Sequence, residues 1–123
     1  MLKQCKICLT ITAILALISI PMGCDGPDTT APEISGVTAS GTSSGAIITW
    51  YTDEPADSQV EYGLDATYGT TTAQGTTLVT SHSVTLSGLD PDTTYHYWVK
   101  STDAHGNNAV SSDATFITTS CYV

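Results

Sequence analysis

Histidine and aspartate are the side chains in this sequence whose spacing could support chemistry. Three histidines occur, His82, His96 and His105, and His105 lies between Asp103 and Asp113 in the chain. An Asp-x-His pair with another carboxylate nearby could bind a divalent metal. The spacing matches no defined metal motif, and no nucleophile with a base and no pair of carboxylates in a pocket is indicated. We therefore predict no catalytic residue, no metal site and no cofactor.

The three histidines are expected in different surroundings. His82 starts an alternating stretch that ends at Leu86, so its side chain is expected to point inward and to be hydrogen-bonded. His96 belongs to the stretch 94–101, where apolar and polar residues alternate, and is expected to point outward. His105 lies in a polar loop at 102–108.

Composition restricts the classes of function. The chain of 123 residues contains 12 acidic side chains, three lysines and no arginine. Without the first 23 residues, one positive charge (Lys100) faces 12 negative charges, a formal net charge of −11. Nucleic-acid phosphates are bound by Lys and Arg, so no nucleic-acid partner is expected. The negative charge is expected to keep the protein soluble and monomeric.

The N-terminus has the pattern of an export signal. Two lysines precede an apolar run at 8–20, which is too short for a comfortable membrane span and suits a signal-peptide core. Residues 21–24, Pro-Met-Gly-Cys, resemble a bacterial lipobox. The likeness implies cleavage before Cys24 and a lipid on that cysteine. The proline and methionine depart from the usual pattern, so plain secretion and an uncleaved anchor stay open.

Composition divides the chain into four parts. We predict a lipoprotein-type signal peptide at 1–23, a Pro- and Gly-containing tether at 24–31, a domain at 32–119 and a tail at 120–123. If Cys24 carries a lipid, Cys121 is a lone thiol that could form an intermolecular disulfide. If it does not, the two cysteines could pair with each other.

Short strand patterns separated by Gly, Ser, Asp and Pro fill the domain, and no helical period is present. Strands are expected at 33–39, 45–51, 58–62, 67–73, 76–80, 82–86, 94–101 and 109–119. The first strand and the two Thr-rich stretches are typical of sheet edges. A turn is expected at 53–56, because Pro55 cannot belong to a central strand. This spacing predicts an all-β sandwich.

The domain resembles a fibronectin type III domain. The likeness is carried by Trp50, by the run Leu-Asp-Pro-Asp-Thr-Thr-Tyr at 89–95, and by the alternating Tyr97 and Val99. The stretches 49–63 and 81–107 are particularly similar to bacterial surface versions and to the N-terminal domain of purple acid phosphatases. The resemblance implies an immunoglobulin-like, seven-stranded Greek-key sandwich. Asp92 stands where the family usually has glycine, and the loop at 103–108 lacks the RGD motif of some relatives.

Six residues are expected to form the framework of this fold: Trp50, Leu89, Pro91, Tyr95, Tyr97 and Val99. Pro91 fixes φ and ends a strand, while Leu89 covers one end of the core. Tyr95 is expected to bury its ring and return its hydroxyl to an upstream backbone group, as in a tyrosine corner. Trp50 is expected to be the largest side chain of the core.

Side chains that the framework does not use are the candidates for binding. Trp98 is expected to point outward from a central strand, where it could stack on a sugar or anchor a partner, or simply cover its neighbours. Ile117 is expected beside it on the neighbouring strand, and Tyr68 has the same status as Trp98. The other candidates are His96, Asp103, His105 and Asn107.

These features predict a non-enzymatic protein-interaction or adhesion module, tethered to the outside of the cell envelope by a lipid. Its partner would be an envelope protein or a polysaccharide. One alternative is a carbohydrate-associated accessory module, and another is a remnant of the N-terminal domain of a purple acid phosphatase-like hydrolase. A secreted form is the alternative location.

Overall fold

The computed structural model describes residues 28–121, which form seven β-strands. They are β1 (Ile34–Gly41), β2 (Gly45–Gly63), β3 (Thr70–Thr71), β4 (Gly75–Ser87), β5 (Thr94–Thr102), β6 (Asn108–Val110) and β7 (Ala114–Ile117). Among the described residues, no helix is long and apolar enough to cross a membrane. The predicted signal peptide and Cys24 lie outside the described residues.

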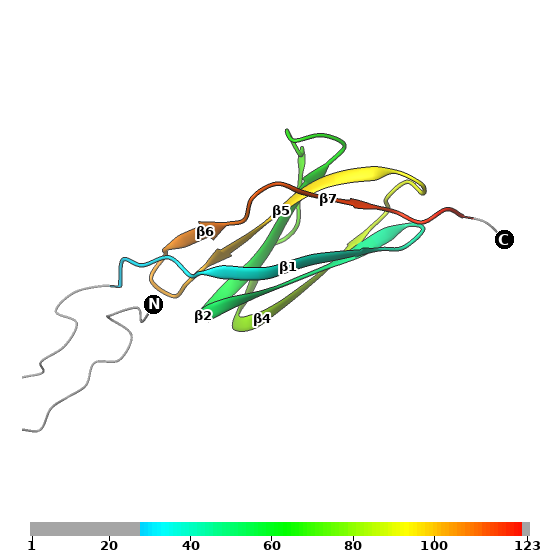
Figure 1. Ribbon diagram of the computed structural model, residues 1–123. Helices are drawn as coiled ribbons and strands as arrows, with labels where there is room; N and C mark the ends of the chain where they lie inside the picture. The colour runs from blue at the N-terminus through cyan, green and yellow to red at the C-terminus, as the bar shows by residue number, and fades with distance from the viewer. Residues whose placement is uncertain (1–27, 122–123) are drawn as a thin grey trace, which may run out of the picture. The chain divides into compact units, whose positions relative to one another are not determined.

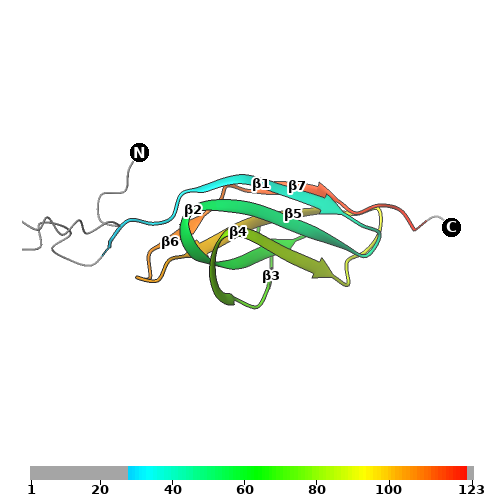
Figure 2. The same cartoon turned by 90° about the horizontal axis from the view of Figure 1, so that it is seen from below.

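Two antiparallel sheets share strand β2. Its first part pairs with β1 on one side and β4 on the other, and these strands form sheet A. Its last residues, from Gln59 on, pair with β3 and β5, and β5 also pairs with β6 and β7, which gives sheet B. Figures 1 and 2 show the two layers and the strands β1 and β7 side by side at one edge. The predicted immunoglobulin-like β-sandwich is confirmed.

The turn predicted at 53–56 is wrong, because β2 continues through it in extended conformation. The ladder with β4 loses its register between Tyr51 and Ala56 and again between Ala56 and Ser58. Pro55 lies in the first of these irregular stretches, where its missing N–H interrupts no regular pairing. Here the strand leaves sheet A and enters sheet B.

Other strand boundaries also differ from the prediction. The Thr-rich stretch 67–73 forms a strand only at Thr70 and Thr71, and the stretches 76–80 and 82–86 are one strand, β4. The last predicted strand is divided into β6 and β7 by the residues around Ser111. The Ser111 N–H donates to the Val99 carbonyl at 2.9 Å, and its Oγ accepts from the Val99 N–H at 3.0 Å. The serine hydroxyl thus replaces a backbone acceptor where the strand breaks.

The core lies between the inner faces of the two sheets. It contains Ala46, Ile48, Trp50, Val60, Leu86, Leu89, Tyr95, Tyr97, Val99 and Phe116. Trp50 is fully buried, and its indole N–H donates to Ser101 Oγ at 2.9 Å. A buried indole N–H needs such a partner. Tyr97, Val99 and Trp50 therefore have the framework roles predicted for them.

The corner that precedes β5 has the expected tyrosine. The hydroxyl oxygen of Tyr95 accepts the Asp90 N–H at 3.0 Å, and its ring stacks on Phe116 with centroids 5.6 Å apart. Leu89 is buried beside the corner. Asp92 has φ of 51°, the left-handed conformation that glycine prefers and that aspartate tolerates. Asp92 therefore takes over the backbone role of the glycine usual at this position.

Candidate functional site

Trp98 lies on the outer face of sheet B and is half-buried. It is directly opposite Glu61 in the β2–β5 ladder, and its indole N–H donates to Glu61 Oε2 at 3.2 Å. The ring of Tyr68 lies against it with centroids 6.0 Å apart and 42° between the ring planes. Tyr68 and Trp98 form what we call the aromatic corner. The outward direction predicted for Trp98 is confirmed.

A tight turn after β2 carries Tyr68 to this place. The Tyr68 N–H donates to the Asp65 carbonyl at 3.0 Å, and Asp65 Oδ1 accepts the Thr67 N–H at 2.9 Å and the Thr67 hydroxyl. Tyr68 itself has φ of 60°, which is unusual for a bulky residue. Its carbonyl lies so close to Gly63 that a Cβ there would be 1.6 Å from the oxygen. The sequence therefore needs glycine at 63 for this turn to reach Trp98.

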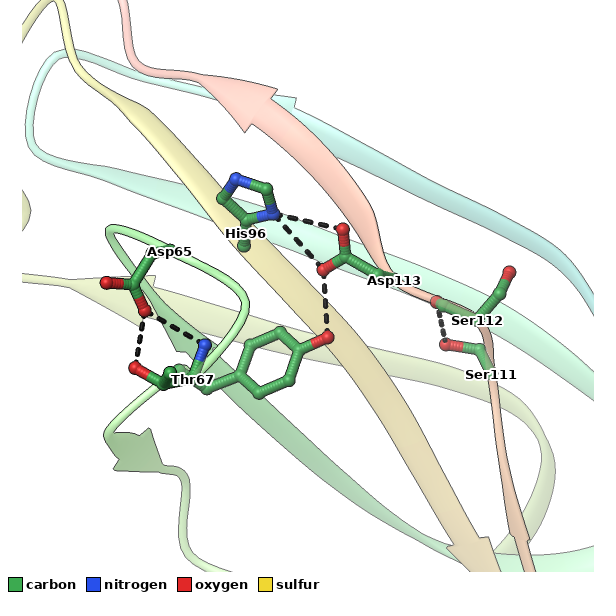
Figure 3. Close-up of polar contacts among 7 residues, drawn as sticks. Asp65, Thr67, His96, Ser111, Ser112 and Asp113 are labelled. Carbon is green, nitrogen blue, oxygen red and sulfur yellow. Dashed lines mark hydrogen bonds and ion pairs between the residues drawn. The ribbon is translucent and has the colours of Figure 1, made fainter.

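Asp113 connects the turn to the sheet. Its Oδ1 accepts the Tyr68 hydroxyl at 2.8 Å, and its Oδ2 is 3.0 Å from His96 Nδ1 (Figure 3). The hydrogen bonds from His96 and Tyr68 lower the pKa of Asp113, so this carboxylate is anionic at neutral pH. The pKa of Tyr68 is raised, by burial first and then by its bond to Asp113. Asp113, which directly precedes β7, thus holds the side chains of both Tyr68 and His96.

The His96–Asp113 pair lies near two serines, Ser111 and Ser112 (Figure 3). Figure 3 shows His96 on β5 facing Asp113, while Ser111 and Ser112 lie beyond the aspartate, where Ser111 Oγ donates to the Ser112 carbonyl at 3.0 Å. Within residues 28–121, no serine or cysteine is hydrogen-bonded to Nε2 of His96. An activated nucleophile needs a base in direct contact. The arrangement offers hydrogen-bond acceptors and ring faces, which are features of a binding surface.

Ile117 is the predicted site residue that the structure places elsewhere. It is 62% exposed and lies opposite Thr94 in the β5–β7 ladder, four residues from Trp98 along β5. The prediction that it lies beside Trp98 is wrong, because β7 ends its pairing with β5 at Ala114, opposite Tyr97. Asp113, which precedes β7, comes near His96 and Tyr68 instead.

The loop between β5 and β6 uses two of its predicted binding residues for its own structure. The buried Asp103 accepts from the N–H groups of His105 at 2.7 Å and Asn107 at 2.9 Å, and from Asn107 Nδ2 at 2.9 Å. Burial alone would raise the pKa of Asp103, but these hydrogen bonds outweigh it and lower the pKa. His105 is exposed. Asp103 and Asn107 are therefore loop-forming residues.

Asp113 does not lie with Asp103 and His105, as the three-residue metal site considered from the sequence would require. Asp113 is instead engaged by His96 and Tyr68.

Two members of the aromatic corner's surroundings, Glu61 and Asp113, were not among the predicted site residues. Their roles depend on pairing between strands: Glu61 lies opposite Trp98 in the β2–β5 ladder, and Asp113 lies in the break between β6 and β7. Alternation within one strand does not reveal such pairing. A local signal did exist in Gly63 and Gly69, which flank the turn that carries Tyr68. His82, by contrast, is 2% exposed and lies in the core, as predicted.

Comparison with known proteins confirms the resemblance. The family model of the purple acid phosphatase N-terminal domain matches residues 32–119. Endoglucanase B of Cellulomonas fimi is 35% identical over 116 residues, and the match covers 88% of this chain and 11% of that protein. This chain therefore corresponds to a small part of that enzyme.

Two solved structures are similar to this chain. The sensor domain of the anti-sigma factor RsgI4 of Pseudobacteroides cellulosolvens has a TM-score of 0.51 at 20% identity, over 74% of this chain and 97% of that chain. The sixth fibronectin type III domain of human fibronectin type III domain containing protein 3 has a TM-score of 0.48 at 22% identity, over 82% of this chain and 93% of that one.

Proposed function

The chain belongs to the family of purple acid phosphatase N-terminal domains, and from this premise we propose that it is a non-catalytic accessory module that binds carbohydrate. The observation that carries the proposal is the aromatic corner. Trp98 and Tyr68 are half-exposed and lie against each other on the outside of sheet B, with the carboxylates of Glu61 and Asp113 beside them. Ring faces surrounded by a few placed acceptors suit a ligand with apolar faces and many hydroxyls, and sugars have this character.

The likeness to Endoglucanase B supports this choice over the protein-interaction role. The identity of 35% indicates that this chain and the matching part of Endoglucanase B share a common ancestor. We propose that this chain acts beside a glucan-degrading enzyme by holding a polysaccharide and not by cleaving it.

The test is binding of the full chain to a panel of polysaccharides, measured by affinity electrophoresis or calorimetry. Truncating a central aromatic anchor typically costs about 2 kcal/mol or more, so Trp98→Ala should weaken binding by about 30-fold. Tyr51→Ala is the matched control, since Tyr51 is 57% exposed on the outer face of sheet A. Binding to no polysaccharide, or equal loss in both variants, would overturn the proposal. If Trp98→Ala does not fold, Tyr68→Ala replaces it.

A second candidate, the protein-interaction or adhesion module, is favoured by a different surface. Ile47 and Tyr51 point outward from the same face of β2 and are 44% and 57% exposed. Exposed apolar side chains of this size on one sheet face can anchor a protein partner. The expected result is a crosslinked envelope protein that is lost in Ile47→Ser and kept in Trp98→Ala. The same crosslink in both variants would contradict this candidate.

We also propose that the domain works outside the cytoplasm, held by a lipid on Cys24. The lipobox-like sequence at 21–24 and the apolar run before it support this. The intact mass of the protein from native membranes would report cleavage and lipid attachment together. Unchanged release into the medium after Cys24→Ala would contradict the lipid anchor and favour plain secretion.

A further inference from the structure

The angle between the two rings of the aromatic corner restricts the kind of polysaccharide that can bind. With centroids 6.0 Å apart and planes inclined by 42°, Tyr68 and Trp98 touch each other. They do not form two separate, coplanar stacking surfaces. A flat crystalline surface needs coplanar rings in order to touch more than one. A tilted, contacting pair instead offers two ring planes of different orientation at one place, which suits a single sugar ring.

The angle is fixed by the protein. The Tyr68 hydroxyl is bonded to Asp113 at 2.8 Å, and its backbone is held at Asp65 and against Gly63. The other ring is fixed by the bond from Trp98 to Glu61. Each aromatic ring is therefore attached at its polar end to a different carboxylate. A surface held in this way cannot flatten without loss of these bonds, and it is already ordered for its ligand.

Charge restricts the ligand further. Glu61 and Asp113 lie next to the rings, and Asp65 lies in the turn that carries Tyr68. Lys100, two residues after Trp98 on the same face of β5, is the only Lys or Arg in residues 28–121. Carboxylates accept hydrogen bonds from sugar hydroxyls, but they repel the carboxylate or sulfate of an acidic sugar. The surface is therefore complementary to neutral sugars.

We infer that the aromatic corner binds one pyranose unit of a neutral, solvated polysaccharide chain, and that it excludes both uronate-containing chains and crystalline surfaces. This inference rests on the proposed carbohydrate binding and specifies its ligand class. One ring of the sugar lies in the corner, and its hydroxyls donate to Glu61 and Asp113. The neighbouring units of the chain extend into solvent on either side.

The test uses the full chain and three probes: neutral cello-, xylo- and manno-oligosaccharides, oligogalacturonate, and crystalline cellulose. The expected result is binding of at least one soluble neutral oligosaccharide, with a loss of about 30-fold in Trp98→Ala, the loss typical of an aromatic anchor. Tyr68→Ala should lose binding too, and Tyr51→Ala should not. The binding should change little with salt, because no charge pairs with the ligand.

A separate variant tests the exclusion of acidic sugars. Glu61→Gln combined with Asp113→Asn keeps acceptors at both positions and removes two negative charges, so oligogalacturonate binding should rise at least severalfold relative to the unchanged chain. Trp98-dependent binding of crystalline cellulose without soluble ligands, or of oligogalacturonate by the unchanged chain, would overturn this inference and leave the proposed function standing. Absence of any Trp98-dependent sugar binding would overturn both.

Discussion

The rings of Trp50 and His82 stack in the core with centroids 4.8 Å apart and 3° between their planes. The two nitrogens of His82 are hydrogen-bonded to hydroxyls, Nδ1 to Ser58 at 2.7 Å and Nε2 to Thr52 at 2.9 Å. Thr52 donates its own hydroxyl hydrogen to the Glu54 carbonyl at 2.6 Å, so it accepts from Nε2–H. Ser58 then donates to Nδ1. The neutral imidazole therefore donates one hydrogen bond to Thr52 and accepts one from Ser58, so both of its nitrogens are hydrogen-bonded.

This arrangement predicts that the domain loses stability below neutral pH. Burial lowers the pKa of His82, although the nearby Asp57 acts in the opposite direction. The unfolded chain then binds a proton near its ordinary pKa of about 6.5, while the folded chain does not. The free energy of unfolding should be constant above that pH and should fall as the pH drops below it. Urea unfolding at several pH values between about 7.5 and 5 measures this.

The control for this prediction isolates one histidine. In a His96→Gln, His105→Gln background, His82 is the only histidine left, and the pH slope should persist. Adding His82→Gln should remove it. Asp65, Asp103 and Asp113 have lowered pKa values, so the stability they add is lost only at more acidic pH, below about 4. A slope that survives in the triple variant would contradict the assignment to His82.

Trp50→Ala should be severely destabilising. The indole is fully buried, bonded to Ser101 and stacked on His82, so its removal leaves a cavity beside His82 and takes the donor away from the buried Ser101 hydroxyl. Replacing a buried Trp by Ala costs about 3–5 kcal/mol, a large part of the stability of about 5–15 kcal/mol of a typical domain. Urea unfolding followed by circular dichroism gives the difference. Ser83→Ala, on the exposed face of β4, should change stability by no more than about 0.5 kcal/mol.

Tyr95→Phe should remove one hydrogen bond and keep the packing. The phenol oxygen accepts the Asp90 N–H, and the ring still stacks on Phe116 in the variant. Leaving a partly buried N–H without its acceptor costs about 1–3 kcal/mol. Hydrogen exchange should become faster at Asp90 and remain unchanged at Val60, which lies opposite Val99, four residues along β5 from Tyr95. Protection at Asp90 equal to that of the unchanged chain would show that the corner does not depend on this bond.

The fold could be predicted from the sequence because its signals are local. Alternation places Tyr95, Tyr97 and Val99 inward without reference to the rest of the chain. The Leu-x-Pro-x-Thr-x-Tyr run contains all the residues of the tyrosine corner. The path of β2 past Pro55 was not predictable in this way. Whether an extended Asp-Glu-Pro-Ala stretch turns or crosses between sheets depends on which strand lies beside it, and that strand is β4, some twenty residues later.

The candidate site shows the same limit more sharply. Alternation correctly placed Trp98 and His96 outward. It could not supply their neighbours, because these depend on the register of β7 after the break at Ser111, which places Ile117 opposite Thr94 and leaves Asp113 just before the strand. Likewise, nothing in the Thr-rich stretch reveals that Tyr68 takes a left-handed conformation and lies against Trp98. Contacts between residues distant in sequence define this surface.

Gly63→Ala tests whether the aromatic corner depends on the turn that carries Tyr68. An added Cβ would be 1.6 Å from the Tyr68 carbonyl oxygen, so the turn must move away from β2. Overpacking of this kind costs about 1–3 kcal/mol, and Tyr68 should lose its contacts with Trp98 and Asp113. Fluorescence of the two tryptophans should change through Trp98, and sugar binding should fall as far as in Tyr68→Ala. Gly75→Ala is the matched control, because its Cβ would meet Ser58 at 3.4 Å or more, an ordinary contact. Identical fluorescence and stability in the two variants would show that Tyr68 keeps its place without the glycine.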